Sequence, residues 1–235
     1  MKKYILQIDT STPICSVAIS LDGMTVAQTQ ADGHNMHAAA LTQLISDLLT
    51  ASSLALNQLS AISVSKGPGS YTGLRIGISV AKGLCYALDY PLIAVDSLQM
   101  LCEGFRQSDY PQSLHEQHLL CPMIDARRRE VYQAIFTSSG HLVQPTSAAI
   151  IDEYSFDWLI SDQSIFLFGS GADKFADLFA SDPKVHVVSG FPASATYLSH
   201  LSFQLFLEGR FEDLAYFEPF YLKDFVPTTP KKKQF

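Results

Sequence analysis

The chain has 235 residues, of which 47% are hydrophobic and 17% are charged, and its formal net charge is −7. This length suffices for one large domain or two small ones, and the apolar share excludes a disordered chain. The negative charge disfavours a broad nucleic-acid-binding face on this chain alone.

The sequence carries no clear membrane or secretion signal. No apolar run is long enough to span a membrane, and Asp9 interrupts the apolar N-terminal stretch, so we expect no signal peptide. The cysteines at Cys15, Cys85, Cys102 and Cys121 are scattered, without a CxxC pair. We interpret them as small buried thiols of a cytoplasmic protein, not as a metal site or a disulfide framework.

The first half of the chain predicts alternating strands and helices. Asp22-Gly23 lies between two β-type runs and predicts a tight hairpin, so the first three strands are expected to be antiparallel. Leucine and isoleucine then recur at helical spacing. The expected elements are strands at 3–9, 14–20 and 24–30, a helix at 36–52, a strand at 61–65, a helix at 73–88, a strand at 91–95 and a short helix at 97–104.

A glycine-rich turn, KGPGSYTG, lies between the strand at 61–65 and the helix at 73–88. Glycines in this position let backbone N–H groups face outward beside a helix N-terminus, which favours anion binding. The turn is not a P-loop, because no Gly-Lys-Ser/Thr follows, and it lacks the GxGxxG spacing. It therefore predicts an anion cradle of another kind.

A polar stretch at 106–118 predicts a linker, and the second half then partly repeats the first. Ile8-Asp9 corresponds to Ile124-Asp125, and Gly67-Pro68-Gly69 corresponds to the 169–171 segment, which leads into an expected helix at 172–180. The repeat favours a duplicated α/β fold with two lobes, mixed sheets flanked by helices and a cleft, as in ribonuclease H-like, actin-like ATPases. The alternative is one mixed α/β domain with chance similarity.

These patterns predict a domain organisation. The expected parts are an N-terminal lobe at 1–105, the linker at 106–118, a C-terminal lobe at 119–227 and a flexible tail at 228–235, with a helix at 194–208 that could pack back on the first lobe.

Four stretches resemble one known family. They are IDTSTPICSVAISLDG (8–23), KGPGSYTGLRIGISVAKGLCYAL (66–88), IDARRREVY (124–132) and EPFYLK (218–223). Their order and spacing resemble the bacterial TsaB proteins, also called YeaZ or glycoprotease-like M22 proteins. The resemblance is most specific over residues 1–100 and loose over 133–215. It implies an actin-like two-lobed fold and a role in making threonylcarbamoyladenosine, the modified base beside the anticodon of tRNAs that read codons starting with A.

The resemblance also implies partners. In that family the TsaB protein is not the transferase; it dimerises with its paralogue TsaD, which is, and the ATPase TsaE docks on the pair. We therefore expect a non-catalytic scaffold or activator subunit that reaches tRNA through the complex and forms a homodimer when alone. We expect no cofactor beyond weak adenine nucleotide binding at the complex interface. The main rival is an actin-like ATPase or kinase acting on its own; a metallopeptidase is less favoured.

The nucleotide loops of this fold are poor in glycine here. An actin-like site wraps phosphates with two glycine-bearing hairpins, whereas the corresponding segments 10–14 and 126–129 contain no glycine. Hydroxyls of the first loop could still contact phosphate, and Asp9 could hold a hydrated Mg²⁺, or instead only cap its own turn. The candidates for this vestigial site are Asp9, Thr10, Ser11, Thr12, Gly67, Gly69 and Ser70.

No metal site is predicted. The resemblance implies that the transferase paralogue carries a His-x-x-x-His pair just after the strand that is 91–95 here, where this chain reads DSLQML without histidine or cysteine. Two other pairs, His34 with His37 and His115 with His118, lack further ligands or the HExxH spacing. We interpret all four as solvent-exposed histidines.

The helix at 73–88 is apolar nearly all round, which predicts burial on two sides. A stripe of small residues recurs every four positions beside a stripe of large apolar ones. The helices at 36–52 and 73–88 could pack only on each other, but the resemblance implies a four-helix interface with the paralogue. The interface candidates are His37, Ala40, Leu44, Gly73, Ile76, Gly77, Val80, Ala81 and Leu84.

Two basic clusters stay open to interpretation. Asp125, Arg127 and Glu130 are cleft candidates, and the Arg127-Arg128-Arg129 run could contact a nucleotide, a partner or tRNA phosphate, or be a solvated hairpin turn. The tail at Lys231-Lys232-Lys233 could add a weak RNA contact or serve only solubility.

Overall fold

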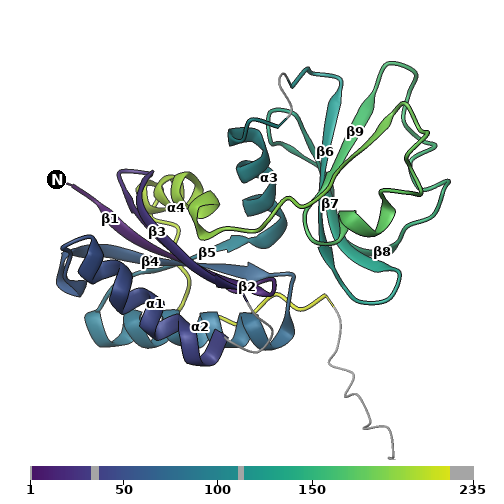
Figure 1. Ribbon diagram of the computed structural model, residues 1–235. Helices are drawn as coiled ribbons and strands as arrows, with labels where there is room; N and C mark the ends of the chain where they lie inside the picture. Colours follow the sequence, from purple (N-terminus) through teal and green to yellow (C-terminus); the bar gives the residue numbers. More distant parts are fainter. Residues whose placement is uncertain (1, 33–36, 111–113, 223–235) are drawn as a thin grey trace, which may run out of the picture.

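The computed structural model describes residues 2–32, 37–110 and 114–222 and divides into two lobes (Figure 1). The first sheet consists of β1 (Tyr4–Asp9), β2 (Ile14–Leu21), β3 (Met24–Asp32), β4 (Leu59–Gly67) and β5 (Leu92–Asp96). The second consists of β6 (His118–Asp125), β7 (Glu130–Thr137), β8 (Leu142–Ile150), β9 (Ser164–Phe168) and β10 (Val185–Val188). The helices are α1 (His37–Ala51), α2 (Tyr71–Leu88), α3 (Ser97–Gln107) and α4 (Leu198–Leu207), with short 3₁₀ turns η1 (Leu56–Gln58), η2 (Ala172–Phe175) and η3 (Ala195–Tyr197).

The two sheets have the same topology. Their strand orders are β3-β2-β1-β4-β5 and β8-β7-β6-β9-β10. In each sheet the first three strands in sequence are antiparallel, and the last two run parallel to the first. This repeat confirms the predicted duplicated α/β fold, because a chance similarity within one mixed sheet would not reproduce five strands in the same order and sense.

The hairpin between β2 and β3 forms where the sequence predicts it. Asp22 and Gly23 both adopt left-handed backbone, with φ of 50° and 86°, and Leu21 pairs with Met24 across the turn. Two consecutive left-handed residues match the twist of the flanking strands, which is why Asp-Gly is favoured here.

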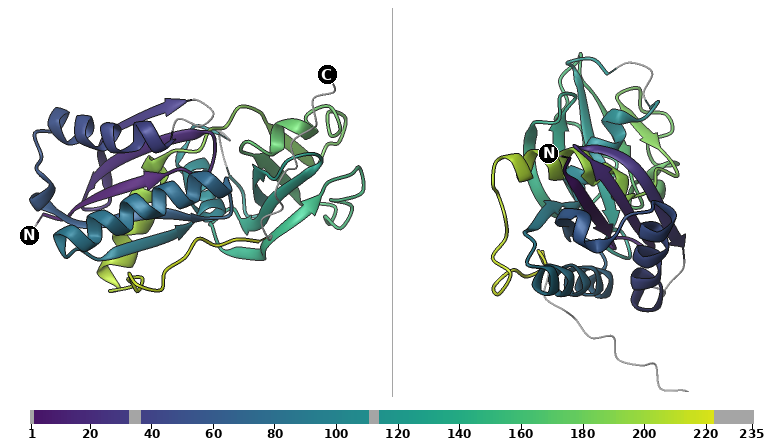
Figure 2. Two further views of the ribbon diagram at one scale, coloured as in Figure 1. Left: turned by 90° about the horizontal axis from the view of Figure 1, so that it is seen from below. Right: turned by 90° about the vertical axis from the view of Figure 1, so that its left-hand side faces the viewer.

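Helices cover the first sheet on both faces. α1 and α2 pack on one face, and α4 with η3 packs on the other (Figures 1 and 2). α3 lies between the lobes, where Phe105 stacks on Phe168 of β9 with ring centroids 4.0 Å apart. The same apolar cluster includes Ile5 and Ile93 of the first sheet and Leu120 of the second. The lobes therefore share one hydrophobic layer centred on α3.

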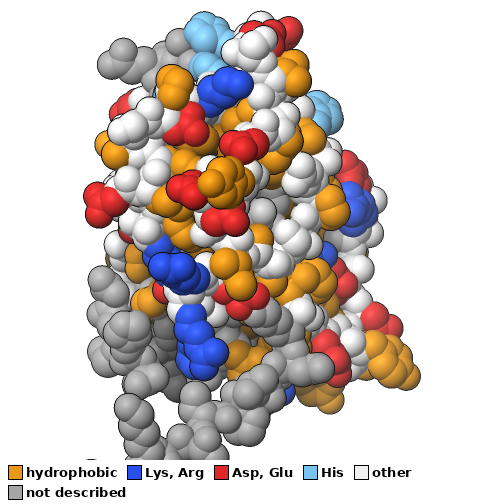
Figure 3. Space-filling view, turned by 90° about the vertical axis from the view of Figure 1, so that its right-hand side faces the viewer, with side chains coloured by type: hydrophobic (Ala, Val, Ile, Leu, Met, Phe, Trp, Pro, Cys, Tyr) orange, Lys and Arg blue, Asp and Glu red, His pale blue; other side chains and the backbone are white. Residues whose placement is uncertain are grey.

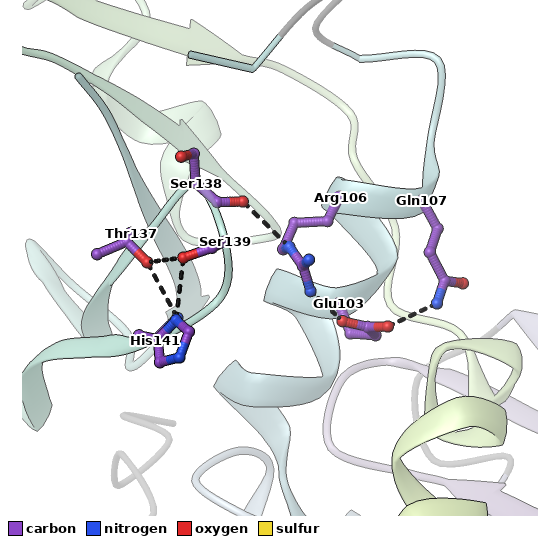
Figure 4. Close-up of polar contacts among 7 residues, drawn as sticks. All are labelled: Glu103, Arg106, Gln107, Thr137, Ser138, Ser139 and His141. Carbon is purple, nitrogen blue, oxygen red and sulfur yellow. Dashed lines mark hydrogen bonds and ion pairs between the residues drawn. The ribbon is translucent and has the colours of Figure 1, made fainter. Parts of the chain in front are cut away.

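Polar contacts also tie α3 to the second lobe (Figure 4). Arg106 donates to the carboxylate of Glu103 at 2.7 Å and to the backbone carbonyl of Ser138 at 3.1 Å, in the turn between β7 and β8. Gln107 donates to the other Glu103 oxygen at 2.7 Å. The nearly buried carboxylate of Glu103 is thus paired on both oxygens, as burial of a charge requires.

The outer face of the second sheet is covered by loops and 3₁₀ structure. The prediction of a helix at 172–180 is wrong beyond the first turn. The 3₁₀ turn η2 ends at Phe175, and consecutive turns follow it. Phe175 and Phe179 still face the core beside Phe156, so turns bury the two rings without a regular helix. No helix in the described part of the chain combines the length and apolar character needed to cross a membrane.

Candidate functional site

The first candidate loop, residues 9–12, is buried at the end of β1. The Asp9 carboxylate accepts hydrogen bonds from the Ser11 backbone N–H at 3.1 Å and from the Ser65 hydroxyl at 2.6 Å. Asp9 thus caps its own turn, one of the two roles expected for it. The hydroxyls of Thr10 and Ser11 are buried and have no hydrogen-bond partner in the described part of the chain. A phosphate could reach them only if the loop moved away from α2.

Loop 9–12 packs against glycines of the signature turn, which is the KGPGSYTG segment at 66–73. A methyl group at Gly73 would overlap the carbonyl oxygen of Thr10, and one at Gly69 would overlap the carbonyl oxygen of Ser11. The Ser70 backbone N–H donates to that Ser11 oxygen at 2.7 Å. The small side of α2 therefore accommodates a segment of the same chain.

This packing corrects the predicted anion cradle. The Gly67 N–H donates to the Ser97 hydroxyl at 3.2 Å, and the Ser70 N–H is taken by Ser11, so neither N–H group faces outward as the sequence predicts. The Ser70 hydroxyl accepts from the Gly73 N–H at 3.2 Å and caps α2. The chain's own carbonyl and hydroxyl oxygens take the donors that a bound anion would need.

The small-residue stripe of α2 faces inward, which corrects part of the predicted partner interface. Gly73, Gly77 and Ala81 are buried against the chain itself, and a methyl group at Gly77 would overlap the Thr10 hydroxyl. The other candidates on α1 and α2 are half-buried: Ala40, Leu44, Ile76, Val80 and Leu84. All of them except Ala40 pack against the hydrophobic core between these helices and the first sheet. The side chain of His37, like His34, lies outside the described residues.

The segment after β5 starts α3, and its first side chain caps that helix. The Asp96 carboxylate accepts from the backbone N–H groups of Leu98 at 2.8 Å and Gln99 at 3.1 Å, so it caps the helix. Burial raises the pKa of this carboxyl group, although these two hydrogen bonds oppose the shift. Thr146 of β8 donates to the other Asp96 oxygen at 3.4 Å, a contact across the lobes that the sequence does not reveal. No group of three or more His, Cys, Asp or Glu side chains in the described ranges could hold a metal ion.

The second candidate loop is the turn between β6 and β7, and it is exposed. The Asp125 carboxylate accepts from the Arg127 backbone N–H at 2.6 Å, as Asp9 does from Ser11 in the first loop. The ammonium group of Lys174 pairs with Asp125 and donates to the Arg128 carbonyl at 3.0 Å. Lys174 was missed from the sequence, although the Gly-Ser-Gly repeat at 169–171 indicates that its segment follows β9 at this end of the sheet.

Residues 218–222 of the C-terminal motif run along α2 (Figure 2). The Phe220 backbone N–H donates to the Lys66 carbonyl at 2.7 Å, beside the signature turn. The Tyr221 hydroxyl accepts from Arg75 Nε at 2.9 Å, and the Arg75 guanidinium lies 4.2 Å from the centroid of the Tyr71 ring. These contacts hold Phe220 and Tyr221 against the glycine-rich turn and the first turn of α2.

Comparison with known proteins identifies the family. The family model described as "TsaD: tRNA N6-adenosine threonylcarbamoyltransferase" matches residues 29–155. The chain is 30% identical over 231 residues to the tRNA threonylcarbamoyladenosine biosynthesis protein TsaB of Escherichia coli strain K12, covering 94% of this chain and 95% of that protein. The chain belongs to the TsaB family. A TsaB protein of Bacillus subtilis strain 168 is 35% identical over 140 residues, covering 60% of this chain and 58% of the relative.

Solved structures share the fold of this chain. YeaZ from Pseudomonas aeruginosa superposes with a TM-score of 0.75 at 28% identity and covers 94% of this chain and all of that one. The activator of the 2-hydroxyisocaproyl-CoA dehydratase from Clostridium difficile, with bound ADPNP, has a TM-score of 0.52 at 9% identity, covering 89% of this chain and 97% of that chain. The second likeness shows the fold alone.

Proposed function

We propose that this chain is a non-catalytic subunit of the assembly that makes threonylcarbamoyladenosine in tRNA, where it scaffolds and activates a TsaD-like transferase. The names of its TsaB relatives support the pathway. The observation that carries the non-catalytic role is the start of α3, where the resemblance puts the metal ligands of the transferase.

The first residues of α3 cap the helix, accept a backbone hydrogen bond or pack in the core. Asp96 is the helix cap, and Ser97 accepts the Gly67 N–H. Leu98, Met100 and Leu101 are buried in the cluster that joins the lobes. Binding a catalytic metal needs at least three nitrogen, sulfur or oxygen ligands around an open position. Aliphatic side chains in a packed core supply none, so the metal belongs on the partner.

The proposed partner surface is the outward side of α1 and α2. Leu44, Ile76, Val80 and Leu84 leave part of their apolar surface in solvent, and Tyr86 of α2 is 84% exposed. The equivalent helices of a TsaD-like paralogue would cover this strip in a four-helix interface, and a second copy would cover it when the chain is alone. A TsaE-like ATPase would then dock on the pair, with any adenine nucleotide bound weakly at the interface.

Light scattering after size-exclusion chromatography tests the partner surface. Buried positions such as Gly77 are unsuitable for the test, because a bulky group there would disrupt the fold. Ser79 and Gly83 are exposed on α2, and nothing lies within 4 Å of a methyl group at Gly83. We expect Ser79→Arg with Gly83→Arg to abolish the heterodimer with the TsaD-like paralogue, and Ser161→Arg, exposed on the second lobe, to leave it intact.

The catalytic role is tested separately. The complete assembly should form threonylcarbamoyladenosine, whereas the chain alone should bind no stoichiometric metal and turn over no ATP. No heterodimer with the wild-type chain would remove the scaffold role. ATP turnover by the pure chain would instead favour the rival, an ATPase or kinase acting on its own.

A further inference from the structure

We propose that the turn between β6 and β7 binds the backbone phosphates of RNA through Arg127, Arg128 and Arg129, the arginine turn. This inference rests on the proposed function in tRNA modification and adds a direct RNA contact on this chain. All three arginines are exposed. None of their guanidinium groups has a hydrogen-bond or ion-pair partner among the described residues.

The backbone of the arginine turn is unfavourable for arginine. Arg127 has φ of 72° and Arg128 has φ of 54°, a left-handed conformation that suits glycine or asparagine. The pseudo-equivalent loop of the first lobe is buried: its Thr10 packs on Gly73 and Gly77 of α2, and its Ser11 packs on Gly69 just before α2. Two long cationic side chains stand at unfavourable backbone positions, and no hydrogen bond or ion pair of their guanidinium groups in the described structure offsets that cost, which points to a role in binding.

Hydrogen bonds from Lys174 and within the turn fix the backbone of the arginine turn. Lys174 pairs with Asp125 and donates to the carbonyls of Arg128 at 3.0 Å and Glu130 at 3.2 Å. The Glu130 N–H donates to the Arg127 carbonyl at 3.2 Å, and the Ala126 N–H donates to the Glu130 carbonyl at 3.1 Å. The backbone beneath the arginines is thus ordered before a ligand binds, which lowers the entropy lost on binding.

The charge distribution favours an anionic ligand at this place. The pairing with Lys174 neutralises Asp125, which would otherwise draw the guanidinium groups inward. The segment 150–190 of the same lobe carries seven acidic and two basic residues. Figure 3 shows acidic side chains spread over the centre of this face and separate groups of basic side chains near its top, at its right edge and at its lower left. An anion is therefore repelled from the acidic centre of the face and attracted only to local groups of basic residues.

RNA backbone fits the arginine turn better than an acidic protein surface does. A guanidinium fork forms paired hydrogen bonds with phosphate oxygens, and consecutive phosphates along one strand can engage neighbouring arginines. The proposed assembly acts on tRNA, so such phosphates are present whenever it works.

Fluorescence anisotropy with labelled tRNA and the assembled complex tests the proposal. We expect Arg127→Asn with Arg128→Gly to weaken binding by roughly tenfold at about 0.1 M salt, and to lower the slope of log affinity against log salt by about 1 to 2. Because Asn-Gly suits a left-handed turn, the same variant should raise the thermal midpoint of the free chain, so lost binding cannot be lost folding. The matched control is Lys2→Gln with Arg210→Gln, which removes the same charge from other exposed positions and should change neither quantity.

Each other outcome overturns the proposal. Unchanged affinity and salt slope with an intact complex would show that the arginines do not contact RNA, while the proposed function stands. Loss of the heterodimer in the Asn-Gly variant would assign the turn to a protein contact instead. Failure of the wild-type assembly to bind or modify tRNA would overturn the proposed function and this inference together.

Discussion

At the scale of single residues, the signature glycines are explained by close approach. Gly73 has an ordinary helical backbone, so it is required for space and not for conformation: a side chain there would meet the Thr10 carbonyl. Gly83 lies on the same helix with nothing within 4 Å of an added methyl group. A substitution at Gly73 therefore tests close packing, whereas a substitution at Gly83 tests helix propensity alone.

Substitution by alanine at these two glycines should have opposite effects. We expect Gly73→Ala to lower the free energy of unfolding by about 1–3 kcal/mol, because overpacking forces the loop off α2. Gly83→Ala should raise it by about 0.5–1 kcal/mol, since alanine is the better helix former. Urea unfolding followed by circular dichroism measures both. Equal effects in the same direction would contradict the close packing of loop 9–12 on α2.

A histidine at the start of β6 should make stability depend on pH. The pKa of His118 is lowered by burial, and also by the positive charges that His115 and His186 gain on protonation. The His115 N–H donates to Nδ1 of His118 at 3.0 Å, which requires that nitrogen to be unprotonated. His115 and His118 belong to the polar stretch in which both were expected to be solvent-exposed; His115 is exposed, but His118 is half-buried against Phe166.

The sign of this effect follows from the lowered pKa. The unfolded chain, with an ordinary histidine pKa of about 6.5, binds more protons than the folded chain below that pH. The contribution of His118 to stability is therefore present above pH 6.5 and is lost as the pH falls through its lowered folded pKa. Urea midpoints measured at pH 7.5 and about 5.5 should differ less for His118→Asn than for the wild type. An identical loss in both proteins would count against this assignment.

At the scale of secondary-structure elements, the sequence predicted those elements that depend on residues adjacent in the chain. The Asp22-Gly23 turn and the apolar periodicity of α2 are properties of neighbouring residues, and the structure has both elements. β8 was missed because most of its side chains are exposed, so it shows no alternation of apolar and polar residues. The inward direction of the Gly73 stripe also escaped prediction, because a stripe of small residues fits a partner helix and a folded-back loop equally well.

The C-terminal segment should stabilise the first lobe although it has no regular structure. Phe217 is buried in the cluster beneath α1 and α2, and its carbonyl accepts from Lys82 at 3.0 Å. We expect Phe217→Ala to cost about 3–5 kcal/mol of unfolding free energy. The neighbouring Tyr216 is 84% exposed, so Tyr216→Ala should change stability by no more than about 0.5 kcal/mol. Similar losses for the two variants would show that the segment is not packed as described.

At the scale of the whole molecule, the layer around α3 decides how the lobes unfold. Phe105 packs with Phe168 and Phe191, and its cluster contains residues of both sheets. Two lobes with separate cores could unfold independently, whereas lobes that share a buried layer lose it together. The duplicated topology alone would suggest two separate unfolding transitions, but the shared core predicts a single one.

The single tryptophan and the buried thiols allow this prediction to be tested lobe by lobe. Trp158 reports on the second lobe by fluorescence, whereas labelling located by peptide mass spectrometry at Cys15 of β2 and Cys85 of α2, among the four free thiols, reports on the first. Burial raises the pKa of the Cys15 thiol to about 11 and that of Cys85 to about 12, so native thiols should label slowly at neutral pH. We expect tryptophan fluorescence and thiol labelling to change at the same urea concentration. Phe105→Ala should lower both midpoints together, by about 3–5 kcal/mol in unfolding free energy, because the cavity lies in the layer that both lobes share. A variant in which the thiols react while the fluorescence stays native would mean that the lobes unfold separately and that α3 belongs to only one of them.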